Sequence, residues 1–191
     1  MKQFALFLLS AILFINQQAC KNRQQTNGKA TDSTTASSKP ATDVAIAGHL
    51  AELNLTPNSD WRGINLGDDF ANVKATEKGE AFESDDKHVG YTVEFKNLES
   101  ADMLYHQANQ KVSEIDVDLF LNTRQSVDAH QKELGDYFTS KYGSSKPTDG
   151  GLAWTGPKGQ QVLLKDVSKG KDFGLKIKIT STGGAVTASA K

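Results

Sequence analysis

The chain has 191 residues, with 22 basic and 23 acidic side chains and 37% hydrophobic residues. This near-neutral balance lacks the basic footprint of nucleic-acid-binding proteins, so nucleic acid is excluded as a partner. The hydrophobic content is enough for one compact core, and we expect a single folded domain.

The first twenty residues are organised as an export signal. Lys2 precedes a run of mostly apolar residues, 4–15. This run is shorter than the ~20 residues of a membrane-spanning helix but has the length of a signal-peptide core. Ala19 and Cys20, the only cysteine, follow directly. An ordinary secretory signal ending here would leave Cys20 as a free thiol.

This arrangement resembles the lipobox of bacterial lipoproteins cleaved by type II signal peptidase, in the looser form typical of Bacteroidota, because Gln17 stands where Leu is usual. The resemblance implies cleavage after Ala19 and acyl chains such as palmitate on Cys20, which would anchor the protein to a membrane. Residues 21–24 resemble neither an inner-membrane retention signal nor a surface-export signal. The resemblance therefore implies the periplasmic face of the outer membrane.

A flexible tether is predicted between the anchor and the domain. Residues 21–42 contain no large apolar side chain, and such a segment cannot bury enough surface to offset its ordering entropy. A short helix within residues 44–55, before Pro57, is a further expectation. The predicted boundaries are signal peptide 1–19, lipidated cysteine and tether 20–59, folded domain 60–180 and disordered tail 181–191.

The first half of the domain predicts a short helix and three strands. Asp68 is a suitable N-cap for this helix, and Gly79 is a suitable left-handed residue at its end. Alternating apolar and polar residues then predict strands at 91–95, 103–107 and 114–121. Asn109 and Gln110 are expected to form a tight hairpin turn.

The second half repeats this order. Residues 123–142 carry apolar side chains at a period of 3.6 and predict a helix, capped by Thr123 or Ser126 and ended by Gly143. Strands are predicted to follow at 152–155, 161–166 and 172–180. The predicted class is therefore α+β, an antiparallel sheet of about six strands with two helices on one face, and the order suggests two αβββ modules.

The entry to this domain, Ile64-Asn65-Leu66-Gly67, resembles the Ile-x-Leu-Gly opening of small envelope proteins with helix-on-sheet folds. These are the BamE/SmpA-like outer-membrane lipoproteins and modules like the β-lactamase inhibitory protein. The resemblance implies a protein that binds other proteins and catalyses no reaction.

Three carboxylates, of Glu114, Asp116 and Asp118, share one face of a predicted strand. They are candidates for a calcium site, although Ca²⁺ takes six to eight oxygen ligands. We favour a solvated face whose charges are paired with Lys176 and Lys178 on a neighbouring strand.

No catalytic residue, metal ligand or cofactor is assigned from the sequence. No two of the four histidines have the helical spacing of a zinc site. The sequence contains no P-loop, dinucleotide fingerprint or Gly-x-Ser-x-Gly elbow. A rival hypothesis is a small-ligand-binding protein or hydrolase whose pocket, between sheet and helices, involves His130, Asp136 or Tyr137.

Trp61 and Trp154 stand at the openings of the two halves. They are candidate anchors of a partner-binding surface, since aromatic residues dominate binding hot spots, and core packing is the alternative.

The leading hypothesis is a lipid-anchored envelope protein that binds another envelope component without catalysis. A calcium-binding lipoprotein is the third hypothesis.

Overall fold

The computed structural model describes residues 45–182. The strands are β1 (Glu83–Ser84), β2 (His88–Glu94), β3 (Ser100–Ala108), β4 (Lys111–Leu121), β5 (Lys146–Thr148), β6 (Gly151–Thr155), β7 (Gln160–Asp166) and β8 (Phe173–Ser181). The helices are α1 (His49–Glu52), α2 (Ala71–Glu77) and α3 (Arg124–Tyr142), and a 3-10 turn spans Lys96–Leu98. The predicted signal peptide, Cys20 and the end of the tail from residue 183 lie outside the described residues.

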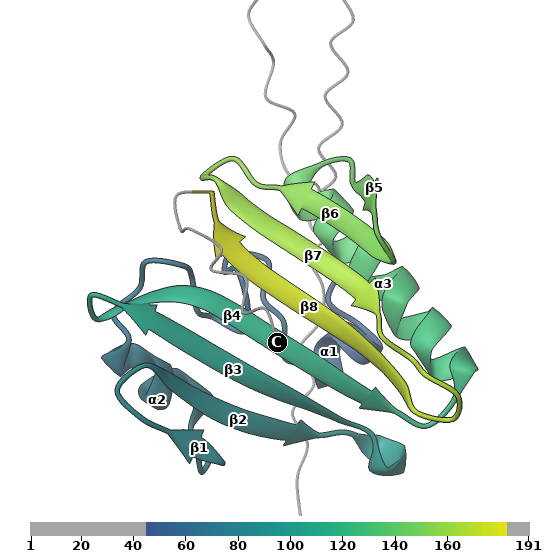
Figure 1. Cartoon of the computed structure of the whole chain (residues 1–191), viewed down its shortest axis with the longest axis horizontal. Coiled ribbons are helices and arrows are strands. Elements are labelled where there is room, and N and C mark those ends of the chain that lie inside the picture. Colours follow the sequence, from purple (N-terminus) through teal and green to yellow (C-terminus); the bar gives the residue numbers. More distant parts are fainter. Residues whose placement is uncertain (1–44, 183–191) are drawn as a thin grey trace, which may run out of the picture. The chain divides into compact units, whose positions relative to one another are not determined.

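One antiparallel sheet contains all eight described strands, in the order β1-β2-β3-β4-β8-β7-β6-β5. Figure 1 shows this sheet with α1, α2 and α3 behind it. The predicted α+β class and antiparallel sheet are confirmed, with eight strands in place of about six. No helix within residues 45–182 is long and apolar enough to cross a membrane.

The two unpredicted strands, β1 and β5, form the two edges of the sheet. They contain two and three residues, so they are too short to show alternation. Pro147 lies in β5, where an edge position tolerates the missing backbone N–H. In chain order a helix followed by four strands occurs twice, as α2 with β1–β4 and as α3 with β5–β8. The suggested αβββ modules therefore each lack one edge strand.

The apolar face of the sheet is set by the alternation in its two central strands. Val117 of β4 pairs with Ile177 of β8, and both side chains are fully buried. Helix α3 contacts β4, β6, β7 and β8 on this face. Thr123 caps α3 as expected, because its hydroxyl oxygen accepts a hydrogen bond from Ser126 N at 3.0 Å, and the helix ends before Gly143.

The predicted ends of the first helix are wrong. Phe70, not Asp68, occupies the N-cap position of α2. The carboxylate of Asp68 is used in the preceding turn, where it accepts a hydrogen bond from Asn65 N at 2.7 Å. The left-handed residue at the other end is Lys78, with φ 57°, rather than Gly79.

The predicted tether boundary is also wrong, because residues 45–59 belong to the folded domain. Leu50, Leu53 and Leu55 from this segment are buried. The segment is held to α3, since the Tyr137 hydroxyl donates a hydrogen bond to Thr56 O at 2.9 Å. The short helix expected within residues 44–55 is present as α1.

A buried ion pair connects this N-terminal segment to α2 and to the sheet. The Arg62 guanidinium donates to Glu77 at 2.8–3.2 Å and to Leu53 O at 2.7 Å. The Tyr105 hydroxyl of β3 donates to the same carboxylate. The Glu77 side chain is only 2% exposed. These donors therefore take the place of the water that hydrates the carboxylate in the unfolded chain.

Replacing Glu77 by Gln is expected to lower the free energy of unfolding by about 3–5 kcal/mol, because the buried Arg62 charge loses its counterion. Urea denaturation of the wild type and E77Q measures this difference. Asp136→Asn is the matched control, since Asp136 pairs with Lys132 on the exposed face of α3. The prediction fails if E77Q and D136N shift the urea midpoint equally.

Candidate functional site

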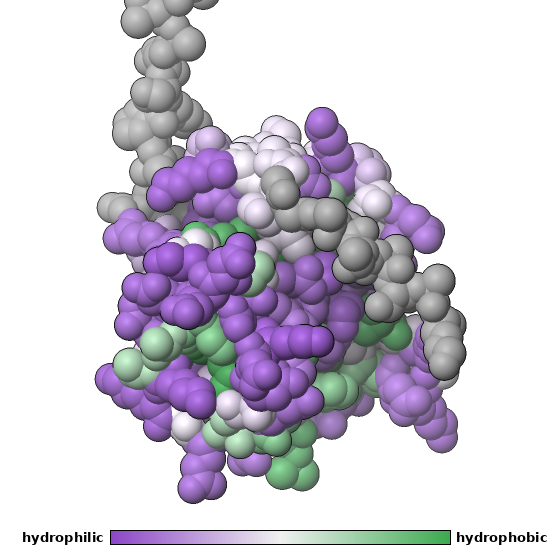
Figure 2. All heavy atoms as spheres, turned by 60° about the vertical axis from the view of Figure 1, so that its left-hand side comes forward, coloured by the Kyte–Doolittle hydropathy of each residue, from purple (hydrophilic) through white to green (hydrophobic). Residues whose placement is uncertain are grey.

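The face of the sheet opposite the helices carries polar and charged side chains along its central strands. Figure 2, in which the side of the domain with β1, β2 and α2 comes forward, shows hydrophilic atoms over most of the visible surface. Lys176 Nζ lies 2.7 and 2.9 Å from the two carboxylate oxygens of Asp118. Lys178 binds Glu114. The expected pairing of these lysines with the acidic strand is therefore present.

A compact group of metal-ligand side chains lies next to these ion pairs. The donor atoms of His106, Glu114 and Asp116 all lie within 4.8 Å of one another. His106 on β3 pairs in register with Glu114 on β4, and Asp116 is two residues further along the same face. Asp118, which the sequence analysis grouped with Glu114 and Asp116, is not part of this group.

Electrostatics in this group favour the ionised form of Asp116. Burial on its own would raise the pKa of Asp116, but the imidazole of His106 and the ammonium of Lys178, together with Glu114, lower this pKa below its usual value. The site therefore holds a carboxylate rather than a carboxylic acid at neutral pH.

A second histidine, His88, lies beside this group and contacts two carboxylates of its own. His88 on β2 pairs in register with His106, and the two ring centroids are 5.7 Å apart. Its two ring nitrogens lie 2.9 Å from Glu83 and 3.2 Å from Asp85. The pKa of Asp85 is lowered by hydrogen bonds from the backbone N–H groups of Lys87 and His88.

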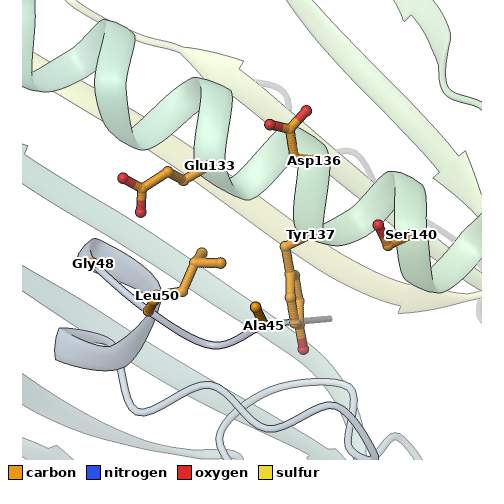
Figure 3. Close-up of a pocket in the computed structure, with 8 residues that line it drawn as sticks. Ala45, Gly48, Leu50, Glu133, Asp136, Tyr137 and Ser140 are labelled. Atoms are coloured by element: carbon orange, nitrogen blue, oxygen red, sulfur yellow. The ribbon is translucent and has the colours of Figure 1, made fainter. Parts of the chain in front are cut away.

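A groove between the N-terminal segment and α3 has a volume of about 390 Å³ (Figure 3). Glu133 points toward Gly48 at one end, where its carboxylate accepts hydrogen bonds from His49 N at 3.0 Å and pairs with His49 Nδ1 at 2.9 Å. Asp136 points away from Leu50. The two carboxylates of this groove are therefore engaged with the protein itself or turned outward.

Of the three residues of the rival pocket hypothesis, Asp136 and Tyr137 line this groove, whereas His130 is not part of its lining. His130 is buried, and its ring is tilted by 39° against the ring of His49 at a centroid distance of 4.0 Å. Burial lowers the pKa of His130. Asp136 pairs with Lys132 on the outer face of α3 at 2.7 Å. The Tyr137 hydroxyl is bound to Thr56 O, and burial raises the pKa of this phenol.

Both tryptophans belong to the core of the domain. Trp61 is 0% and Trp154 is 2% exposed. The Trp154 indole donates a hydrogen bond to Thr139 Oγ1 at 3.1 Å and packs on Phe138 at a centroid distance of 5.3 Å. Both tryptophans therefore pack in the core, which was the alternative expectation for them. Neither ring is accessible to a partner in this fold.

A buried polar cluster lies around Asp60. Its carboxylate accepts hydrogen bonds from the Tyr142 hydroxyl and from Gln160 Nε2, both at 3.1 Å. Nearby, Lys141 Nζ donates to Ser59 O and to the Tyr137 hydroxyl. Burial lowers the pKa of Lys141 to about 8, although Asp60 acts in the opposite direction. This cluster joins the N-terminal segment to α3 and β7.

Comparison of the chain with protein-family models, with curated proteins and with solved structures found no match.

Because Lys141 loses its proton more readily in the folded state, the unfolded chain binds more protons than the folded chain between about pH 8 and pH 10. The free energy of unfolding should therefore gain up to about 1.4 kcal/mol per pH unit from this group in that range. Urea denaturation at several pH values measures the slope, which Lys141→Met should reduce. The exposed Lys132→Met is the control, and an unchanged slope in K141M contradicts the prediction.

Proposed function

We propose that this chain is a lipid-anchored protein of the bacterial cell envelope, attached through Cys20 at the periplasmic face of the outer membrane. Its α+β domain acts by binding another envelope protein and catalyses no reaction. The export-signal pattern of residues 1–20 supports the anchor. The observation that carries the binding role is a group of exposed apolar side chains at one end of the sheet.

This group, the apolar tip, consists of Leu98, Phe120 and Val167, which are 97%, 53% and 40% exposed. Phe120 on β4 pairs in register with Gly174 of β8 and with Ser100, two residues after Leu98. The side chain of Val167 lies over Gly174, since a Cβ placed there would stand 3.6 Å from Val167 Cγ2. The three residues therefore lie near the point where β3 begins and β4 ends.

The backbone at the apolar tip is strained where Leu98 lies in solvent. Asn97 and Leu98 have φ values of 68° and 62°. The left-handed region costs a leucine roughly 1–2 kcal/mol, and such strain is concentrated at functional sites. Leu98 gains no burial within the described domain in return. A partner that covers Leu98 would supply that burial.

The surroundings of the tip suit a protein partner. Arg124 stacks over Phe173 at 5.5 Å from the ring centroid and pairs with Asp166 beside it. Asn122 donates a hydrogen bond to Asn97 O. An apolar centre with a polar rim containing arginine is typical of protein–protein interfaces.

The anchor is tested by the intact mass of the protein extracted from membranes of the natural host. We expect residues 1–19 to be absent and acyl chains to be attached to Cys20. Cys20→Ser should keep the uncleaved leader and lose the lipid mass. A wild-type protein found in the soluble fraction with its leader intact and a free thiol would overturn the proposed anchor and location.

The binding role is tested with a photo-crosslinking amino acid placed at Phe120 in living cells. Phe82 is the matched control, because it is also a phenylalanine with 53% exposure and covers Gly90 elsewhere on the same sheet. A discrete crosslinked protein band is expected from position 120 only, and Leu98→Ala should weaken it severalfold. Equal bands at both positions, or no band at position 120, would overturn the assignment of the tip.

A further inference from the structure

The group formed by His106, Glu114 and Asp116 has unsatisfied polar atoms. His106 Nε2 and Asp116 Oδ1 are shielded from solvent and have no hydrogen-bond partner. His106 Nε2 lies 3.3 Å from Asp116 Oδ2, but the contact lacks hydrogen-bond alignment. Leaving a buried polar atom unpaired costs about 1–3 kcal/mol. A ligand that accepts electron pairs from both residues would remove this cost.

The donor set selects the chemical class of that ligand. An imidazole nitrogen and carboxylate oxygens are both ligand types that Zn²⁺ takes, and three protein ligands leave a fourth position for water or substrate. Ca²⁺ and Mg²⁺ prefer oxygen ligands alone, so the histidine distinguishes this site from the calcium site considered from the sequence.

The distances require only a small contraction. Tetrahedral zinc with bonds of about 2.0–2.1 Å separates its donor atoms by about 3.3 Å. The three donor atoms here already lie within 4.8 Å of one another. All three residues stand on paired strands, so the backbone positions are fixed and rotation of the side chains supplies the rest.

The ammonium group of Lys178 already lies beside the two carboxylates of this group. Lys178 Nζ binds the Glu114 carboxylate and lies 3.6 Å from Asp116 Oδ1. The ammonium stands at the end of a flexible four-carbon chain, so it can leave without moving the strand. Lys178 therefore neutralises the two carboxylates when no metal is bound and competes with a metal ion for them.

We propose that His106, Glu114 and Asp116 bind one divalent transition-metal ion of the Zn²⁺ class, and that Lys178 moves aside when the ion binds. The site lies on the open face of β3 and β4, and it does not depend on the lipid anchor or on the apolar tip.

Isothermal titration calorimetry with Zn²⁺ alone tests this site. The full chain carrying Cys20→Ser is used throughout, because this change removes the only thiol. We expect one Zn²⁺ per chain. Asp116→Asn and His106→Gln should each weaken binding at least tenfold. Asp118→Asn is the matched control on the same strand, held by Lys176 instead, and should change the affinity less than twofold.

Lys178→Met should raise the zinc affinity severalfold, because the competing ammonium is gone. In the histidine NMR spectrum, Zn²⁺ should shift the imidazole signals of His106 and leave those of His49 and His130 in place, which locates the ion even if one variant fails to fold. No binding by the wild-type site, or equal losses in D116N and D118N, would overturn the proposal. A lower affinity in K178M, or shifts confined to His49 and His130, would also overturn it.

Discussion

The domain depends on the burial of one face of its sheet. The central strands β4 and β8 alternate apolar and charged residues, as in Val117 beside Asp118 and Ile177 beside Lys178. Burial of the apolar set against α3 stabilises the fold by roughly 25 cal/mol for each Å² removed from water. The same alternation places Glu114, Asp116 and Asp118 of β4 and Lys176 and Lys178 of β8 on the opposite face. The composition of the open face is thus a consequence of how the core is built.

The two halves of the sheet are covered in different ways. Helix α3 has 19 residues, whereas α2 has only seven, so α2 leaves part of the first half uncovered. Side chains from the segment before α2 occupy that space, among them the buried Leu53, Trp61 and Ile64. The hydrogen bonds of Arg62 with Glu77 and Leu53 O fix this segment in place. A stretch whose first residues look like part of a tether in the sequence is therefore a structural substitute for a longer helix.

Periodicity in the sequence predicts the long helices and strands. It does not predict helix ends or strand register, which depend on contacts with other residues. Strands β2, β4 and β8 and helix α3 follow from alternation and from a 3.6-residue repeat, because burial of one face imposes those periods. The N-cap of α2 is not predictable in this way, since Asp68 bonds to Asn65 instead. The sequence also does not predict that His106, Glu114 and Asp116 lie together. The turn at Asn109 and Gln110 pairs Ala108 with Lys111, but a register shift next to His106 brings that histidine opposite Glu114.

The edges of the sheet have a consequence for how copies of this domain meet one another. Long exposed strand edges act as templates for pairing with another chain. Here the outermost strands offer two and three residues, and one of them contains a proline that cannot donate a backbone hydrogen bond. Such short edges leave a neighbouring copy few backbone groups to pair with, which disfavours edge-to-edge association.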